Sequence, residues 1–284
     1  MNKSKYIAGW EINFNDPEQF KKILLTQGID EESFKIFSTL QTVTELFIDD
    51  NKVYKTIQHS YGMSDVENVN CTLPITEWKD RRLFYLQKDN EGNHSIGGRK
   101  PDEFILPNDA NVKFIYLGTL DGSDEYFTWL GIEKLNLCYP IFEGFFELYL
   151  DYTEPNRPKL LNPEEINENR IELDSTGFEK LYYTETKFKK VNNVNMDNLQ
   201  AKPENFLLCG VPLWYQYPEI PTCPKTGKLM NYVTTLNSDR EINLENRDEI
   251  ENPPYEKYLI FGDYGNLFIF YQPDSKILYL KMQF

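Results

Sequence analysis

Four cysteines and two histidines are the side chains of this 284-residue chain that could bind zinc or act as nucleophile and base. Structural zinc sites usually draw their ligands from closely spaced cysteine and histidine pairs. Cys209 and Cys223 have no other cysteine or histidine close to them in the sequence, so we predict no metal site and no cofactor. The scattered cysteines, at positions 71, 138, 209 and 223, indicate free thiols in a reducing cytoplasm.

Neither histidine lies in a known catalytic motif. A serine or cysteine nucleophile generally needs a base, most often histidine. His94 and Ser95 come directly before a Gly-Gly pair, and His59 and Ser60 follow an expected strand, but neither pair has a nucleophile-elbow pattern. The glycine-rich loops that bind nucleotide phosphates are also missing from the sequence. We predict no catalytic residue and favour a protein that is not an enzyme.

Carboxylate pairs are plentiful, and glycosidases need two such groups facing one cleft. Glu143 with Glu147, and the acids of segment 121–125, are examples, but a chain with 45 acids contains such pairs by chance. Segment 121–125 (DGSDE) is superficially similar to a calcium loop but lacks the roughly 12-residue frame and its terminal glutamate. We expect a solvated turn there.

Two short stretches remain as candidates for binding. Strand alternation would place Trp214 and Gln216 on one face, as a recognition surface or as a packed tryptophan with its neighbour. Asp263 and Tyr264 lie in a glycine-bearing turn that either forms a tight hairpin or lines a cleft together with the turn at 143–144. These four side chains are our candidate binding residues.

The elements that would position them are mostly strands. Residues 1–95 are expected to form an N-terminal α+β region packed on the rest, with helices starting at Asp16 and Asp30 and a hairpin over 42–58. From residue 96 strands dominate, with one short helix after Asn162-Pro163. The expected strands are 82–87, 113–118, 144–151, 180–188, 231–236, 257–262, 266–272 and 276–284.

Residues 96–284 read as a duplicated β-rich domain, with repeats at about 96–190 and 205–284. Each half begins with a glycine-containing turn, continues into a strand and a long insert, and then has a glycine before an aromatic strand. The structural turns that we expect are at Gly97, Gly98, Gly210, Pro212, Gly262 and Gly265.

The second half resembles the YwqG-like family, a largely bacterial group classed as a domain of unknown function. The matching segments are 210–216 (GVPLWYQ), 221–224 (PTCP), Met230 and 262–270 (GDYGNLFIF). The resemblance covers roughly residues 95–284 and implies an α+β fold with strand-rich, internally duplicated antiparallel sheets and a few short helices. It implies no reaction. Many relatives carry a second cysteine where this chain has Thr226, so no metal or redox role of such a pair is implied here.

The net charge of −15 disfavours some classes of binding partner and favours others. An acidic protein repels phosphate backbones but speeds its association with basic partners. No apolar run is long enough to span a membrane. Our leading hypothesis is a cytoplasmic, non-enzymatic protein-interaction module, in its concrete form an immunity-type protein that neutralises a basic toxin. The alternative is a small-ligand-binding protein or hydrolase with a cleft between the two repeats.

Overall fold

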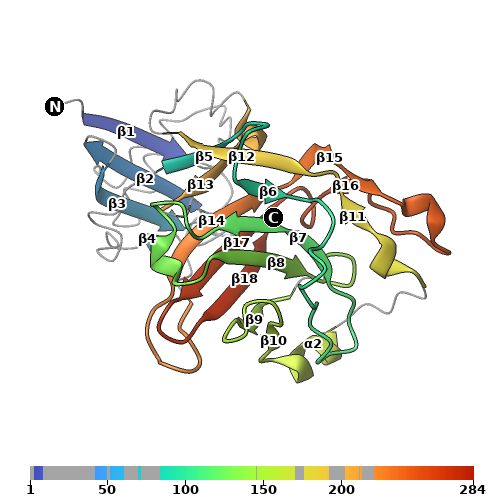
Figure 1. The fold of residues 1–284 in the computed structure, drawn as a ribbon. Helices are drawn as coiled ribbons and strands as arrows, with labels where there is room; N and C mark the ends of the chain where they lie inside the picture. Colours follow the sequence, from blue (N-terminus) through green and yellow to red (C-terminus); the bar gives the residue numbers. More distant parts are fainter. Residues whose placement is uncertain are drawn as a thin grey trace.

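A computed structural model describes most of the chain from residue 84 onward (Figure 1). The described residues are 84–144, 146–169, 176–191, 202–210, 212 and 221–284, together with the backbone of four strands nearer the N-terminus. Those four strands form one antiparallel sheet in the order β1 (Lys3–Ala8), β2 (Thr42–Asp49), β3 (Lys52–Ser60) and β4 (Asn70–Cys71). The hairpin expected over 42–58 is therefore present as β2 and β3. The helices expected at Asp16 and Asp30 lie outside the described residues.

The main layer is a single 11-stranded antiparallel sheet, which confirms the predicted strand-rich α+β class. Its order is β10 (Lys159–Leu160), β9 (Leu148–Asp151), β18 (Ile277–Gln283), β17 (Asn266–Gln272), β14 (Asn231–Asn237), β13 (Phe206–Cys209), β5 (Phe84–Lys88), β12 (Thr186–Val191), β6 (His94–Ile96), β7 (Ile115–Asp121) and β8 (Lys134–Tyr139). Because β5 pairs with both β12 and β13, the sheet begins before residue 95.

A second, three-stranded sheet lies beside it, in the order β11 (Tyr182–Tyr183), β15 (Asp239–Glu245) and β16 (Tyr258–Leu259). The described helices are short: α2 (Pro163–Asn169) and the 3-10 turns η3 (Thr128–Leu130), η4 (Phe178–Lys180), η5 (Pro203–Asn205) and η6 (Arg247–Glu249). Helix α2 begins at the predicted position, because Pro163 suits a first helical turn that also carries two acids.

Strands β17 and β18 form a long antiparallel hairpin. Their sequences, NLFIFYQ and ILYLKMQ, are rich in aromatic and aliphatic residues, and nearly every side chain in them is buried. They pair in continuous register from Asn266 opposite Gln283 to Gln272 opposite Ile277. The hairpin predicted from the turn at 273–275 is present.

Three predicted strands are shorter or divided in the structure. Of segment 144–151, only Leu148–Asp151 form a strand, β9. Segment 180–188 splits into β11 and β12 because its first part pairs with β15 in the small sheet and its second part pairs with β5 and β6 in the large one. Of segment 257–262 only Tyr258 and Leu259 are extended, because Phe261 turns toward Ser238 and donates its backbone N–H to that hydroxyl at 2.9 Å. Strands β1, β4, β6, β8, β10, β13 and β15 were not predicted.

Certain features of the two proposed repeats recur at matching places. Strand β7 has a register shift against β8 between Tyr116 and Gly118, and β14 has one against β17 between Tyr232 and Thr234. In each strand the tyrosine hydroxyl bonds the threonine three residues later, Thr119 and Thr235 respectively. A duplication would produce this correspondence, although the duplication itself stays a prediction.

The predicted glycine turns are conformationally special. Gly97, Gly98, Gly210 and Gly262 have φ values of 76°, 86°, 93° and 55°, in the region that side chains rarely adopt. Gly265 has a different reason: a Cβ there would lie 2.1 Å from the carbonyl oxygen of Gln283. Pro212 is buried.

Candidate functional site

The described cysteines are packed into the protein. Burial raises the pKa of the Cys209 thiol to about 12 and raises that of Cys138 as well. Burial acts in the same direction on Cys223, but hydrogen bonds from Ser275, Thr226 and backbone N–H groups outweigh it and lower the pKa of that thiol. All three side chains have 0% exposure, so none is presented to a substrate.

The described residues contain no group of three or more side chains arranged to hold a metal ion. The helices of the described part are all too short or too polar to cross a membrane.

The carboxylates of the sequence-predicted pairs serve structural contacts. Glu143 is buried and accepts the backbone N–H of Lys113 at 3.0 Å. Glu147 pairs with Lys281 at 2.9 Å and accepts a hydrogen bond from Tyr279. Within segment 121–125, Asp121 accepts hydrogen bonds from the backbone and hydroxyl of Ser123, as a solvated turn would.

His94 is buried in the core, and its side chain contacts two acidic residues of a turn, Asp121 and Asp124. Its side chain is 1% exposed, and its Nδ1 accepts the backbone N–H of Asp121 at 3.1 Å. The proton of the neutral ring therefore sits on Nε2, which lies 3.6 Å from a carboxylate oxygen of Asp124. Phe127 packs edge-on against the ring at 5.1 Å. This geometry holds a turn in place and offers no open face to a substrate.

The stability of the protein is expected to fall as the pH drops below about 6.5, in part because of His94. Burial lowers the pKa of His94 in the folded protein, and the nearby Asp124 offsets only part of that effect. The unfolded chain then binds the proton first, so the free energy of unfolding declines with falling pH by at most about 1.4 kcal/mol per pH unit. Urea unfolding between about pH 7 and 5.5, above most carboxyl titrations, measures this slope.

Replacing His94 with glutamine should flatten that slope. The amide oxygen can still accept the Asp121 N–H, whereas the titrating group is gone. The unaltered chain, measured in parallel, is the control. An unaltered slope in the His94 variant would contradict the assignment.

The structure describes two of the four sequence-predicted binding residues. Asp263 and Tyr264 are exposed in the turn before β17, where the guanidinium of Arg240 lies 4.9 Å from the Tyr264 ring centre. Glu143, expected to line a cleft with Asp263, is instead buried. Trp214 and Gln216 lie outside the described residues.

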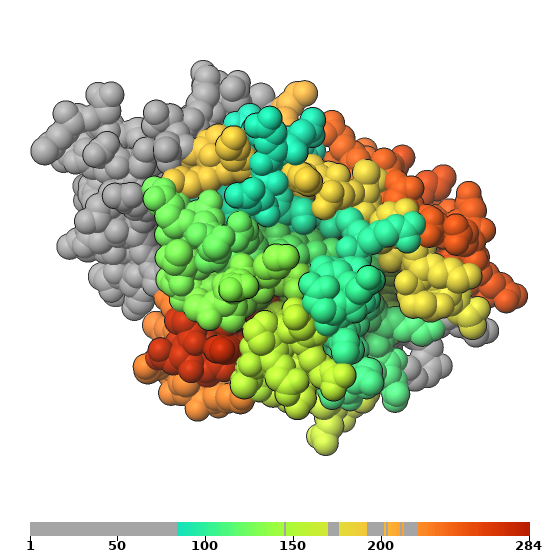
Figure 2. All heavy atoms as spheres, viewed as in Figure 1, coloured from blue at the N-terminus to red at the C-terminus, as the bar shows by residue number. Residues whose placement is uncertain are grey.

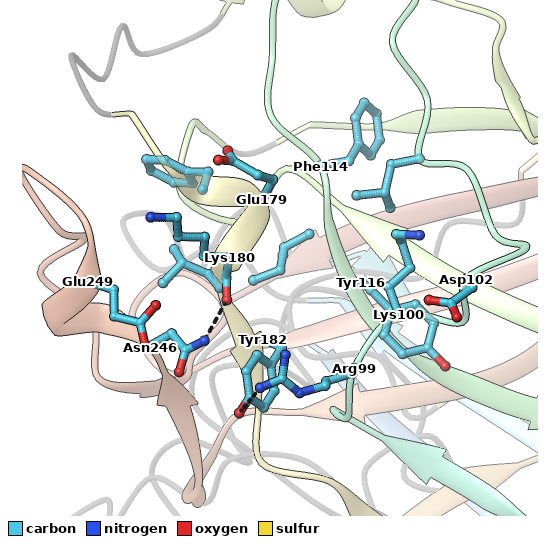
Figure 3. A pocket seen from close by; sticks show the side chains of 14 residues that line it. Arg99, Lys100, Asp102, Phe114, Tyr116, Glu179, Lys180, Tyr182, Asn246 and Glu249 are labelled. Carbon is cyan, nitrogen blue, oxygen red and sulfur yellow. Dashed lines mark hydrogen bonds between the residues drawn. The ribbon is translucent and has the colours of Figure 1, made fainter.

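The structure shows instead a cleft with a volume of about 710 Å³. Its floor is apolar and comes from the start of β7 and from η4, including Phe114, Ile115, Phe178 and Leu181. Its rim carries three cations, Arg99, Lys100 and Lys180, and three acids, Asp102, Glu179 and Glu249. Figure 3 shows these charged side chains around the opening. A volume of this size suits a small organic ligand.

Arg99 is held at this cleft by Tyr182. The guanidinium lies 4.3 Å from the centre of the Tyr182 ring and donates to the phenol oxygen at 3.1 Å (Figure 3). Lys100 is held differently, because its ammonium donates to the backbone oxygens of Phe104 and Pro101 at 2.6 and 3.1 Å. Two glycines with positive φ, Gly97 and Gly98, turn the chain so that both cations reach the rim.

The second wall of the cleft belongs to an acidic hairpin that joins β15 and β16. We define the acidic arm as residues 245–256, which include Glu245, Asp248, Glu249, Glu251 and Glu256. Asn246 and Glu249 line the cleft, and the Asn246 amide donates to the backbone oxygen of Lys180 at 3.3 Å. In Figure 2 the orange-red atoms of this part of the chain lie along the right-hand edge, next to the yellow segment that follows residue 176.

The tip of the acidic arm is braced by its own contacts. The Arg247 guanidinium donates to the backbone oxygen of Pro254 at 2.7 Å, and Leu244 donates to the oxygen of Lys257 at 2.8 Å. Asn246 and Asn252 adopt the left-handed conformation, with φ of 59° and 53°. Tyr255 projects from the brace with 90% of its surface exposed. Exposed tyrosine is enriched in the contact surfaces of proteins.

Sequence reasoning did not identify the cleft or the arm. The only local signal for the cleft is the pair of cations after Gly97-Gly98, and the signal for the arm is the acid-rich run around Pro253-Pro254-Tyr255. The other cleft residues come from distant segments. Comparisons with protein-family models, curated proteins and solved structures gave no match. The resemblance to the YwqG-like family therefore stays a prediction.

Proposed function

We propose that this chain is a non-enzymatic, cytoplasmic interaction protein of the immunity type, which binds a basic protein partner through its acidic arm. The observation that supports this most is Tyr255, which is 90% exposed between acids on a braced hairpin. A tyrosine side chain offers a large amphipathic surface with only two rotatable bonds, so it loses little entropy when a partner covers it.

Charge favours the same kind of partner. The chain has 15 more acidic than basic side chains, and Asp248, Glu249 and Glu251 are exposed on the arm. A basic surface, such as that of a nuclease toxin, would be attracted from a distance, and the acids would occupy the place of the phosphates that it normally binds. The same field repels nucleic acid itself.

A second candidate function, small-ligand binding, is favoured by the cleft. Its volume of about 710 Å³ and its apolar floor suit an organic molecule. The cleft is lined by seven residues between 99 and 116 and by residues 178–182 of the first proposed repeat, and by Asn246 and Glu249 of the second. The residues that line it include no serine, cysteine or histidine, so a hydrolase is the less favoured form of this candidate.

Reversing charge on the arm is expected to weaken partner binding. The products of neighbouring genes would be purified and tested for binding to the full chain, with the Kd measured at several salt concentrations. For a product that binds, Tyr255→Ala should raise the Kd about 30-fold, as loss of a central aromatic contact does. The double change Asp248→Lys/Glu251→Lys should slow association about tenfold and reduce the salt dependence.

The matched control is Glu164→Lys/Glu168→Lys, which makes the same charge change at exposed positions of helix α2. It should alter the Kd much less than the arm variants do. If the α2 variant weakens binding as strongly as the arm variant, the contact is not on the arm. If no neighbouring product binds, or binding is independent of salt, the proposed function is wrong.

A further inference from the structure

Two cations at the cleft rim, Arg99 and Lys180, lack among the described residues the carboxylate partner that several other cations of this protein have. Five lysines form ion pairs with carboxylates at 2.6 to 2.9 Å, namely Lys88, Lys190, Lys225, Lys228 and Lys281. Within the described residues, no ion pair to a carboxylate is formed by Arg99 or Lys180. The positive charges of Arg99 and Lys180 are therefore not neutralised by an ion pair in the described part of the chain and can interact with an anionic ligand at the cleft.

The position of Arg99 is set by the protein before any ligand arrives. Tyr182 supports one face of the guanidinium at 4.3 Å and accepts one of its N–H groups at 3.1 Å. A guanidinium has five N–H donors, so most of them remain for a ligand. A planar fork fixed in this way matches a carboxylate, which can accept two parallel hydrogen bonds.

The floor of the cleft indicates what the carboxylate is attached to. Phe114, Phe178 and Leu181 line the cleft below the charged rim. The side chain of Phe178 also packs against Phe142 with ring centres 5.6 Å apart, so it is held in place. An apolar group on the ligand would cover this floor while its acid group reaches the rim.

We propose that the cleft is a binding site for an organic carboxylate that carries an apolar group, with Arg99 as the main anion contact and Lys180 as a second cation. This inference rests on the second candidate function, small-ligand binding at the cleft, and names its ligand class; it does not depend on the proposed interaction function. The rim acids Asp102, Glu179 and Glu249 disfavour ligands of high negative charge, such as polyphosphates, so a single carboxylate suits the cleft better.

The test uses the full chain and two probes that differ only in charge, N-acetylphenylalanine and N-acetylphenylalanine amide. Binding would be followed by titration calorimetry and by ligand-observed NMR. We expect the acid to bind and the amide to bind about tenfold or more weakly, because the amide cannot accept the charge-assisted pair. Arg99→Gln should remove this preference, and Lys180→Gln should reduce it.

Arg157→Gln is the matched control. Arg157 is an exposed cation in a neighbouring hollow of about 320 Å³ and does not line the cleft. It should leave the preference for the acid unchanged, and thermal melting should show that all three variants fold. Equal binding of acid and amide, no saturable binding in the millimolar range, or an Arg99 variant that keeps the preference would each overturn the proposal.

The Asp248→Lys/Glu251→Lys variant separates the two proposals. Neither residue lines the cleft, so binding of N-acetylphenylalanine should persist in it even where binding of a protein partner is lost. Loss of probe binding in this variant would count against the cleft assignment.

Discussion

Replacing Gly118 with alanine is expected to lower the free energy of unfolding by at least about 3 kcal/mol. A Cβ at this position would lie 2.1 Å from the carbonyl oxygen of Ser95 and 2.8 Å from the Cα of Ile96. Both contacts are with the backbone of the neighbouring strand β6, which cannot move aside as a flexible side chain could. The backbone φ of Gly118 is 137°, which adds strain for any residue with a side chain.

Replacing Gly118 would disturb more than one contact, because Gly118 lies at the register shift between β7 and β8. It pairs with Ile96 on one side and with Leu137 on the other, so displacement of β7 would disturb both ladders. Strand β6 also continues directly into Gly97 and Gly98, which place Arg99 at the cleft. The variant is therefore expected to weaken binding at the cleft as well as stability.

Gly131→Ala is the matched control for this prediction. Gly131 also has a positive φ, of 65°, but a Cβ there would have no atom within 4 Å. The Gly131→Ala change should lower the free energy of unfolding by about 1 kcal/mol, because only the strain of the backbone conformation is added. Urea unfolding followed by circular dichroism measures both variants. Similar losses in the two would show that the approach of β6 to β7 is not what requires glycine at position 118.

Replacing Asp239 with alanine is expected to lower the free energy of unfolding by about 3 kcal/mol. The Asp239 side chain is 3% exposed and pairs with the ammonium of Lys88, itself 19% exposed, at 2.8 Å. Asp239 also accepts the backbone N–H of Glu241 at 2.8 Å. Without Asp239, the partly buried Lys88 would keep only Glu241, whose side chain is 72% exposed.

The pKa of the Lys88 ammonium reflects the same ion pair. Burial lowers the pKa of this ammonium, but hydrogen bonds and charge from Asp239 and Glu241 outweigh burial and raise it. The pair links the end of β5 in the large sheet to the start of β15 in the small sheet. Since β15 leads into the acidic arm, loss of Asp239 should also loosen the arm.

Glu241→Ala is the control, because it removes the exposed partner of the same lysine. An exposed pair contributes little, so this change should cost less than about 1 kcal/mol. The combined change Lys88→Met/Asp239→Leu should recover part of the loss, since no unpaired charge remains inside. Equal losses for Asp239→Ala and Glu241→Ala, measured by urea unfolding, would contradict the burial argument.

Local chemistry in the sequence was sufficient for several elements. Alternation and aromatic content predicted β14, β17 and β18, and the Asn162-Pro163 signal predicted α2, because each depends on residues close together in the chain. The strands β6 and β13 were missed because three or four residues carry too little periodicity.

The residues that form the cleft could be identified only from the tertiary structure. Arg99 and Tyr182 are far apart in the sequence. They meet because β11, which directly precedes β12 in the chain, pairs with β15 of the small sheet and does not join the large sheet. The same pairing brings Asn246 and Glu249 of the arm to the cleft wall. A sequence shows which side chains carry charge, aromatic rings or conformational freedom. Which of them face one another depends on long-range strand pairing, and that is set by the burial of the whole sheet rather than by any local pattern.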